Sequence, residues 1–190
     1  MTNEMLVDAP EPGATSAREE LIASLNHFRQ LSEEISSYEA LCRASESAEA
    51  EALANHSLPE EEAVELIARA QARKHVHEAR IAKKHEQLKV SATKLETAST
   101  AAANQLRGEY LAVLEEKRRV LAEAVLKVLG LPVTQILPPG IGQAVGNSPR
   151  VRAIENCRPM DANAVGHLPI EQRASDVLSK FERLEKEGSI

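Results

Sequence analysis

Residues 81–106 read IAKKHEQLKVSATKLETASTAAANQL, and this stretch decides the fold. Apolar side chains recur in it every seven residues, and small or polar side chains fill the alternate positions of the repeat. The first set is Ile81, Leu88, Leu95 and Ala102, and the second is His85, Ala92, Ser99 and Leu106. A heptad repeat is typical of helices that pair in coiled coils. The stretch therefore predicts a helix that buries one narrow seam, with His85 as a polar position within it.

The helix around this stretch is predicted to be long. Ser57-Leu58-Pro59-Glu60 has the form of a capping box with proline in the first turn. Gly130 followed by Pro132 is a usual helix end, and no proline lies between these two signals. We therefore expect one helix over about 58–129.

A shorter helix is predicted before it. Ser16-Ala17-Arg18-Glu19 is another capping box, and an apolar stripe follows it, so we expect a helix over about 16–55. A short loop makes the two helices antiparallel, and the first is acidic where the second is basic. With the turn centred near 57 and 58, Glu46 comes level with Arg69, and Glu33 and Glu34 with residues 80–83. The fold class is therefore all-α, with a long antiparallel coiled-coil hairpin over 14–130.

The remaining segments are predicted to flank the hairpin. Residues 1–13 read as a flexible tail. Prolines and glycines interrupt the apolar residues of 131–168, so this segment reads either as an extended arm that seats them on another surface or as a partly disordered linker. A short helical turn is expected near 150–155. Residues 169–187 carry a regular apolar stripe and predict a short C-terminal amphipathic helix.

The second half of the long helix needs a cover, because the first helix ends opposite about residue 100 and exposed apolar seams associate. The candidates are a partner chain, a second copy or the C-terminal helix. We expect partner binding or self-association through the seam of 106–129, the arm and the C-terminal helix. The predicted partner-binding residues are Leu106, Tyr110, Val113, Leu121, Val125, Ile136, Leu137, Ile141, Ile170, Val177, Leu178, Phe181 and Leu184.

Composition argues against an enzyme. Apolar residues make up 43% of the 190 residues, but aromatic residues only 2%, so the chain has few of the rings that fill thick cores and ligand pockets. The histidines and the two cysteines do not have the spacing of metal ligands or of a nucleophile with its base. We expect no catalytic, cofactor or metal site. We also expect no membrane segment and a cytoplasmic or other intracellular location.

Two functions follow from these patterns. The first is a non-catalytic assembly protein, which means a coiled-coil scaffold, tether or adaptor in a larger complex, and a virus-particle component suits the arm best. The second is a helical protein associated with nucleic acid, which would contact phosphates through the basic band of 69–94. Its candidate residues are Arg69, Arg73, Arg80 and Lys84. The net charge of -6 favours the first, because it gives no general attraction to nucleic acid.

Overall fold

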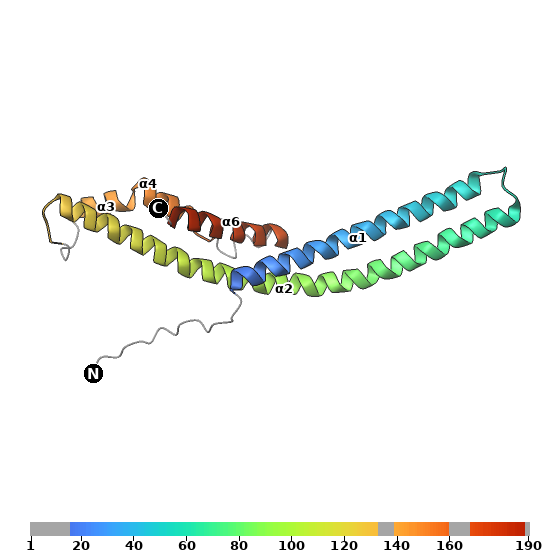
Figure 1. The fold of residues 1–190 in the computed structure, drawn as a ribbon, viewed down its shortest axis with the longest axis horizontal. Helices are drawn as coiled ribbons and strands as arrows, with labels where there is room; N and C mark the ends of the chain where they lie inside the picture. The colour runs from blue at the N-terminus through green and yellow to red at the C-terminus, as the bar shows by residue number, and fades with distance from the viewer. Residues whose placement is uncertain (1–15, 133–138, 160–167, 189–190) are drawn as a thin grey trace, which may run out of the picture. The chain divides into compact units, whose positions relative to one another are not determined.

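The computed structural model describes residues 16–132, 139–159 and 168–188, and confirms the all-α class (Figure 1). No strand occurs among these residues. The predicted bounds of the three main helices agree with the observed ones within two residues. The helices are α1 (Ala17–Ala54), α2 (Glu60–Val128), α3 (Pro139–Gly146), α4 (Pro149–Glu155) and α6 (Ile170–Gly188).

The helix ends follow the local sequence signals, with one exception. At the start of α1, the Glu19 backbone N–H donates to Ser16 Oγ (3.2 Å) and the Ser16 N–H donates to Glu19 Oε2 (3.0 Å). At the end of α2, Gly130 has φ 66°, and the Leu131 N–H donates to the Leu126 carbonyl (2.9 Å). This is the C-terminal motif that favours glycine. The exception is Ser57, whose hydroxyl donates to Asn55 Oδ1 rather than capping α2.

The chain divides into two compact units, one of residues 23–97 and one of residues 1–22 with 98–190. We call the first the hairpin unit and the second the terminal unit. The sequence predicted one hairpin over 14–130, whereas this division places the start of α1 and the second half of α2 in the terminal unit. The two units are held together internally in different ways.

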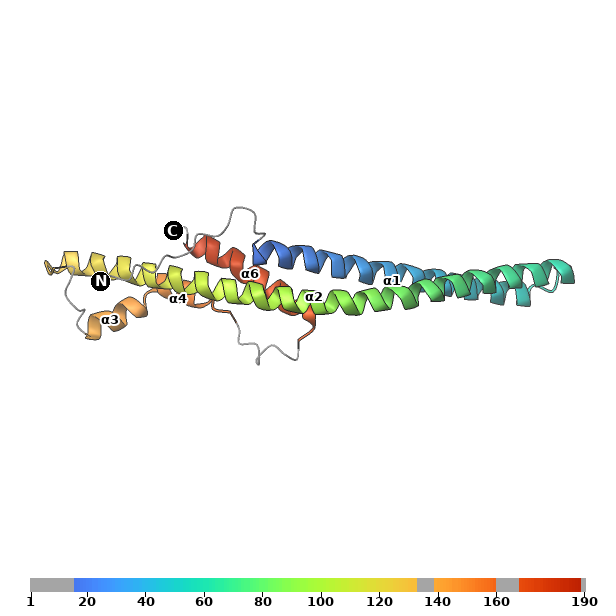
Figure 2. The ribbon, with the colours of Figure 1, turned by 90° about the horizontal axis from the view of Figure 1, so that it is seen from below.

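The hairpin unit consists of antiparallel parts of α1 and α2, joined by residues 55–59 (Figures 1 and 2). Its buried seam is thin and becomes thinner toward the turn. Leucine and isoleucine fill the part far from the turn, and Ser45, Ala52 and Ala70 fill the part near it. The larger buried side chains are Leu25, Leu31, Ile35 and Leu95.

Over residues 84–98 the second line of the α2 seam lies one residue earlier than predicted, whereas Leu106 is buried as predicted. His85 is exposed, whereas Lys84 is half-buried and Ser91 is buried. The seam therefore follows Ile81, Lys84, Leu88, Ser91 and Leu95, in steps of three and four. Neither alternative line is strongly apolar, so the sequence pattern alone did not distinguish them.

In the terminal unit the chain folds back along α2. Arg118 of α2 pairs with Glu155 of α4 (3.0 Å), and the last residue of α6, Gly188, lies against Val113 of α2. Phe181 of α6 is buried beneath the Arg18 guanidinium, which lies 5.5 Å from the ring centroid. The core of this unit also contains Leu106, Tyr110, Leu114, Val151, Ile154, Cys157, Ala174 and Leu184.

The predicted extended arm is more helical than we expected. The turn anticipated near 150–155 is α4, and α3 adds a second short helix before it. Ser148 caps α4 by accepting a hydrogen bond from the Val151 N–H (3.3 Å). Val145, Val151 and Ile154 are buried, so these apolar residues of the arm pack within the chain itself.

Candidate partner-binding surfaces

Two ion pairs join α1 to α2 across the hairpin seam. Lys74 Nζ lies 2.8 Å from Glu46 Oε1, and Lys84 pairs with Glu34. Nearby, Gln71 Nε2 donates to Glu49 Oε1 (2.8 Å). The acidic first helix therefore faces a basic second helix as predicted, but Glu46 pairs with Lys74 and not with Arg69.

Side-chain direction accounts for part of this shift. Helical side chains lean toward the N-terminus of their own helix, so a long lysine on α2 reaches toward the turn. The level of a backbone position along the helix does not include this reach. Because Lys74 lies farther from the turn than Arg69, its ammonium reaches Glu46 by leaning back along α2.

These pairs change the protonation equilibria of their members. The hydrogen bond and charge of Lys74 lower the pKa of Glu46, and Glu46 in turn raises the pKa of Lys74. The hydrogen bond from Lys84 similarly lowers the pKa of Glu34. All are near the surface, where water weakens ion pairs, so they select the register of the hairpin more than they stabilise it.

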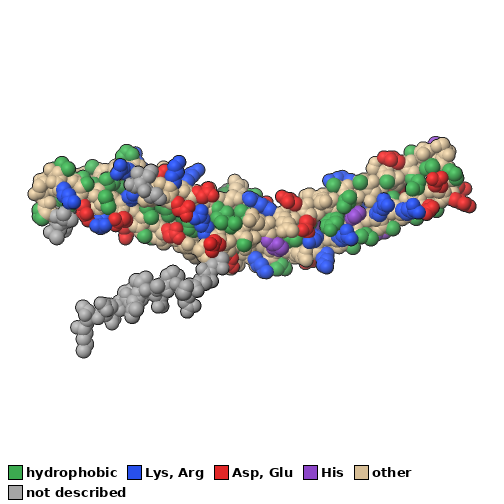
Figure 3. Space-filling model, in the orientation of Figure 1, with side chains coloured by type: hydrophobic (Ala, Val, Ile, Leu, Met, Phe, Trp, Pro, Cys, Tyr) green, Lys and Arg blue, Asp and Glu red, His purple; other side chains and the backbone are tan. Residues whose placement is uncertain are grey.

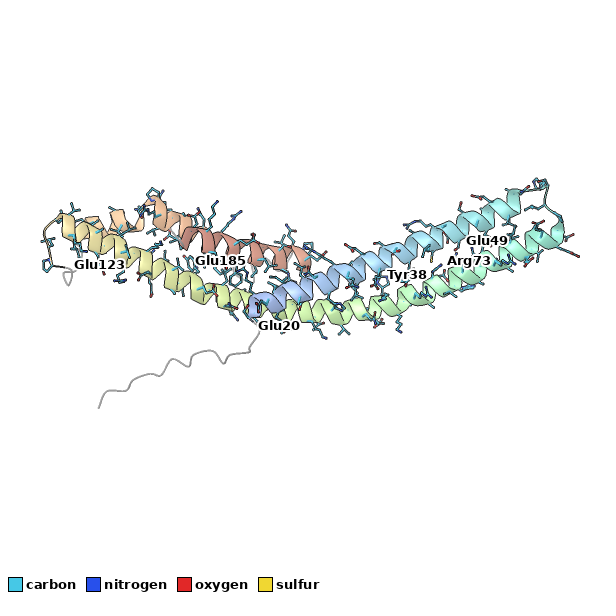
Figure 4. All side chains as sticks on the ribbon, viewed as in Figure 1. Glu20, Tyr38, Glu49, Arg73, Glu123 and Glu185 are labelled. Carbon is cyan, nitrogen blue, oxygen red and sulfur yellow. The ribbon has the colours of Figure 1, made fainter. Side chains whose placement is uncertain are left out.

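The four residues predicted to bind nucleic acid are not equivalent. Arg69 pairs with Glu65 one turn away, and Lys84 pairs with Glu34. The Arg80 guanidinium lies 5.6 Å from the centroid of Tyr38, which projects from α1 toward α2 (Figure 4). Within the part of the chain that the structure describes, Arg73 has no acidic partner.

Of the eleven predicted partner-binding residues that the structure describes, four are buried by the chain itself and seven are half-buried. Leu106, Tyr110, Phe181 and Leu184 lie in the core of the terminal unit, with Leu106 0% and Phe181 1% exposed. The C-terminal helix α6, one of the three candidate covers, therefore does cover part of the seam of 106–129. The helices α3 and α4 cover it as well. The half-buried members are Val113, Leu121, Val125, Ile141, Ile170, Val177 and Leu178. Ile136 and Leu137 lie outside the described residues.

Other apolar side chains are exposed that were not among the predicted partner-binding residues. At the end of α2, Val128 is 87% exposed and Leu129 is about half exposed. On the hairpin unit, Leu41, Leu66, Val76 and Val90 are exposed. Their signal in the sequence was a second heptad spacing beside the seam, which the stronger seam pattern obscured.

Two shallow grooves follow the hairpin unit between its helices. The first has a volume of about 500 Å³, and lies near the turn between Leu41, Ala44 and Ala48 of α1 and Leu66, Arg69 and Arg73 of α2. The second, of about 550 Å³, lies between Gln30 and Glu34 of α1 and Lys83, Gln87, Val90 and Lys94 of α2. On the face drawn in Figure 3, Lys and Arg side chains gather along the α2 side of the hairpin.

A smaller pocket of about 190 Å³ lies in the terminal unit between α2 and α6. Asn104 and Arg107 line it from α2, and Asp176 and Lys180 from α6. Lys180 donates to the Arg158 carbonyl (2.8 Å) and pairs with Asp176 (3.6 Å). The Lys180 ammonium therefore already has partners, one within α6 and one in the residues that follow α4.

Within residues 16–132, 139–159 and 168–188, no group of three or more His, Cys, Asp or Glu side chains is placed to hold a metal ion. None of the described helices is both long and apolar enough to cross a membrane. Comparison of the chain with protein-family models, with curated proteins and with solved structures finds no match.

Proposed function

We propose that the chain is a non-catalytic assembly protein, a coiled-coil scaffold, tether or adaptor that works by binding other proteins in a larger complex. One observation carries the proposal. The hairpin unit closes its own seam with matched charges, and still leaves Leu41, Leu66 and Val90 exposed in shallow grooves and Val76 exposed on α2. Exposed apolar side chains aligned along a groove are typical of surfaces that bind helices.

The terminal unit supports the same function in a different way. Among the described residues, α3, α4 and α6 cover part of the seam of α2, and Leu106, Tyr110, Phe181 and Leu184 are buried there. Such a unit can remain folded while the hairpin binds. Val128 and Leu129 at the end of α2 are an additional exposed apolar site for a protein partner. A component of a virus particle is one assembly of this kind.

Sedimentation in an extract of the native source tests this function. The tagged 20.7 kDa chain, expressed at its natural level, is expected to sediment well above its own mass, together with a defined protein at fixed stoichiometry. Treatment with nuclease should leave this complex intact. Sedimentation at the mass of the free chain would contradict an assembly function.

Nucleic-acid binding is a second candidate, favoured by Arg73, Lys83 and Lys94, which lie exposed along one side of α2. Retention on duplex DNA that falls steeply with salt would support it, because phosphate contacts release counterions. The retention should then be lost when Arg73, Arg80 and Lys84 are changed to Glu. Insensitivity of binding to salt would exclude this function.

A further inference from the structure

The exposed side of α2 in the hairpin unit carries a second heptad repeat. Its members follow one another in steps of four and three between residues 69 and 94, and all are exposed. We call this set the basic line. Its cations are Arg69, Arg73, Arg80, Lys83 and Lys94, and Val76, Gln87 and Val90 lie between them.

A matching repeat follows α1 on the opposite side of the grooves. Its members have the same steps of three and four, and most are small or neutral. We call this set the neutral line, and it includes Gln30, Glu34, Leu41, Ala44, Ala48 and Glu51. Both grooves are lined by members of both lines, so the lines border one groove face along the hairpin.

We propose that this groove face binds an amphipathic helix with an acidic flank, as the third helix of a coiled coil. The inference rests on the proposed function and names the chemistry of the partner. Two heptad lines separated by a groove repeat every 3.5 residues on average, which is the spacing at which the side chains of a partner helix pack in a coiled coil. The basic line spans the 26 residues of 69–94, about 38 Å at the helical rise of about 1.5 Å per residue, so it can contact roughly seven turns of a partner.

The apolar side of the partner has a place to pack. Val76 is 51% and Val90 59% exposed, and Leu41 and Leu66 are also exposed. Ala44 and Ala48 have small side chains on the α1 side of the groove, so the backbone of a third helix can approach closely there. These side chains are largely in water in the single chain, and burying them supplies the driving force for binding.

The cations of the basic line indicate that the flank of the partner helix is negatively charged. Among the described residues, Arg73, Lys83 and Lys94 have no acidic partner, and no acidic side chain occurs on the basic line. The acids that line the grooves already have partners. Glu34 pairs with Lys84, Glu86 pairs with Lys89, and Glu51 accepts a hydrogen bond from the Ser47 hydroxyl. Glutamates spaced by four and three on the partner would pair with these cations and fix its register.

Two other occupants fit the groove face less well. Nucleic acid would place phosphates beside Glu34 and Glu51 and leave Val76 and Val90 against a charged backbone. A second copy of the hairpin would bring a second basic line to a face that already has surplus cations. Both remain distinguishable outcomes of the experiment below.

The test uses the full chain and a fluorescein-labelled 28-residue peptide of four heptads, with Leu at the seam positions and Glu at the flanking positions. The repulsion between its own carboxylates keeps the peptide from pairing with itself. Fluorescence anisotropy should show saturable binding at one peptide per chain. The same peptide with Lys in place of Glu should not bind.

Matched variants locate the site. Arg73→Glu with Lys83→Glu should weaken binding of the Glu peptide by about tenfold or more, which corresponds to about 1.4 kcal/mol. Arg43→Glu with Lys89→Glu makes the same change of charge at exposed residues off the groove face and should alter affinity less than about twofold. Val76→Ser with Val90→Ser should also weaken binding, because the apolar contact is needed. Circular dichroism checks that each variant keeps its helix content.

Three results would overturn the inference. The first is absence of binding to the Glu peptide, or equal weakening by both charge variants. The second is tighter binding of a 20-base-pair DNA duplex that competes with the peptide, which would assign the basic line to nucleic acid. The third is a dimer in light scattering that Arg73→Glu with Lys83→Glu dissociates, which would assign the face to a second copy. A large native complex together with failed peptide binding would overturn this inference alone and leave the proposed function standing.

Discussion

The hairpin unit and the terminal unit use the same helix, α2, in two different ways. In the hairpin unit, α2 meets one antiparallel helix through a thin seam whose register is marked by Glu46–Lys74 and Glu34–Lys84. In the terminal unit, it meets several helical segments around a thicker core that includes Phe181. A thin seam leaves most of each helix exposed, whereas a layered core buries the apolar face within the chain.

The largest expected loss of stability comes from a change in the thicker core of the terminal unit. Phe181→Ala removes a ring that is 1% exposed and should destabilise the terminal unit by about 3–5 kcal/mol. Hydrogen exchange measured by mass spectrometry should accelerate in α4 and α6, with little change in residues 23–97. Equal acceleration in the hairpin unit would show that the two units do not differ in the way we describe.

A smaller effect is expected at the hairpin seam. Leu95→Ala empties a fully buried position and should cost about 2–4 kcal/mol, visible as faster exchange in residues 23–97. Val90→Ala is the control, since Val90 lies on the same helix but is 59% exposed. It should change stability by less than about 0.5 kcal/mol. Similar losses for the two variants would contradict the seam assignment.

Reversing one charge of a seam pair should have a still smaller effect. Lys74→Glu places a second carboxylate beside Glu46, and should lower the melting temperature by a few degrees. Adding Glu46→Lys restores an opposite-charge pair and should recover most of this loss. No recovery in the double variant would mean that the pair does not contribute to the register.

The smallest effect is the pH dependence of the hairpin unit. The pKa values of Glu34 and Glu46 are lowered below the ordinary value of 4.5, so their contribution is present above pH 4.5 and is lost as pH falls further. The pKa of Lys74 is raised above 10.5, so its contribution is present below pH 10.5 and is lost above it. The urea concentration at the midpoint of unfolding, monitored by hydrogen exchange in residues 23–97, should therefore stay constant from about pH 6 to 9.

The matched control for this pH dependence is Glu46→Gln. This variant should reduce the acid-side fall in the urea midpoint, because the group that titrates is gone. An unchanged acid-side fall would assign the pH dependence to other carboxylates.

Much of the fold could be predicted because its signals are local. The capping box at Ser16, the glycine end at Gly130 and the heptad spacing act within a few residues, so the three main helices were predicted within two residues. The signal that identifies the second line of the seam is not local in the sequence. Choosing between Lys84 and His85 required the position of α1, which periodicity alone does not give.

The candidate binding surface was harder to predict than the fold. Leu106, Tyr110 and Phe181 were assigned to partners because the sequence offered the C-terminal helix as one of three covers and did not show that it folds back onto α2. The pairing of Glu46 with Lys74 also depended on side-chain reach. The basic line was visible as a charged band, but its alternation with Val76 and Val90 beside a groove required the structure.

Zero-length cross-linking with a carbodiimide tests the central claim most directly, since the reagent joins a carboxylate to an amine only where the two are in contact. Applied to the monomeric chain and read by mass spectrometry, it should join Glu46 to Lys74 and Glu34 to Lys84 within one molecule. These products would fix the antiparallel register that leaves the groove face open. Cross-links in a different register, such as Glu46 to Lys83, or the same pairs formed only between two molecules, would contradict the account.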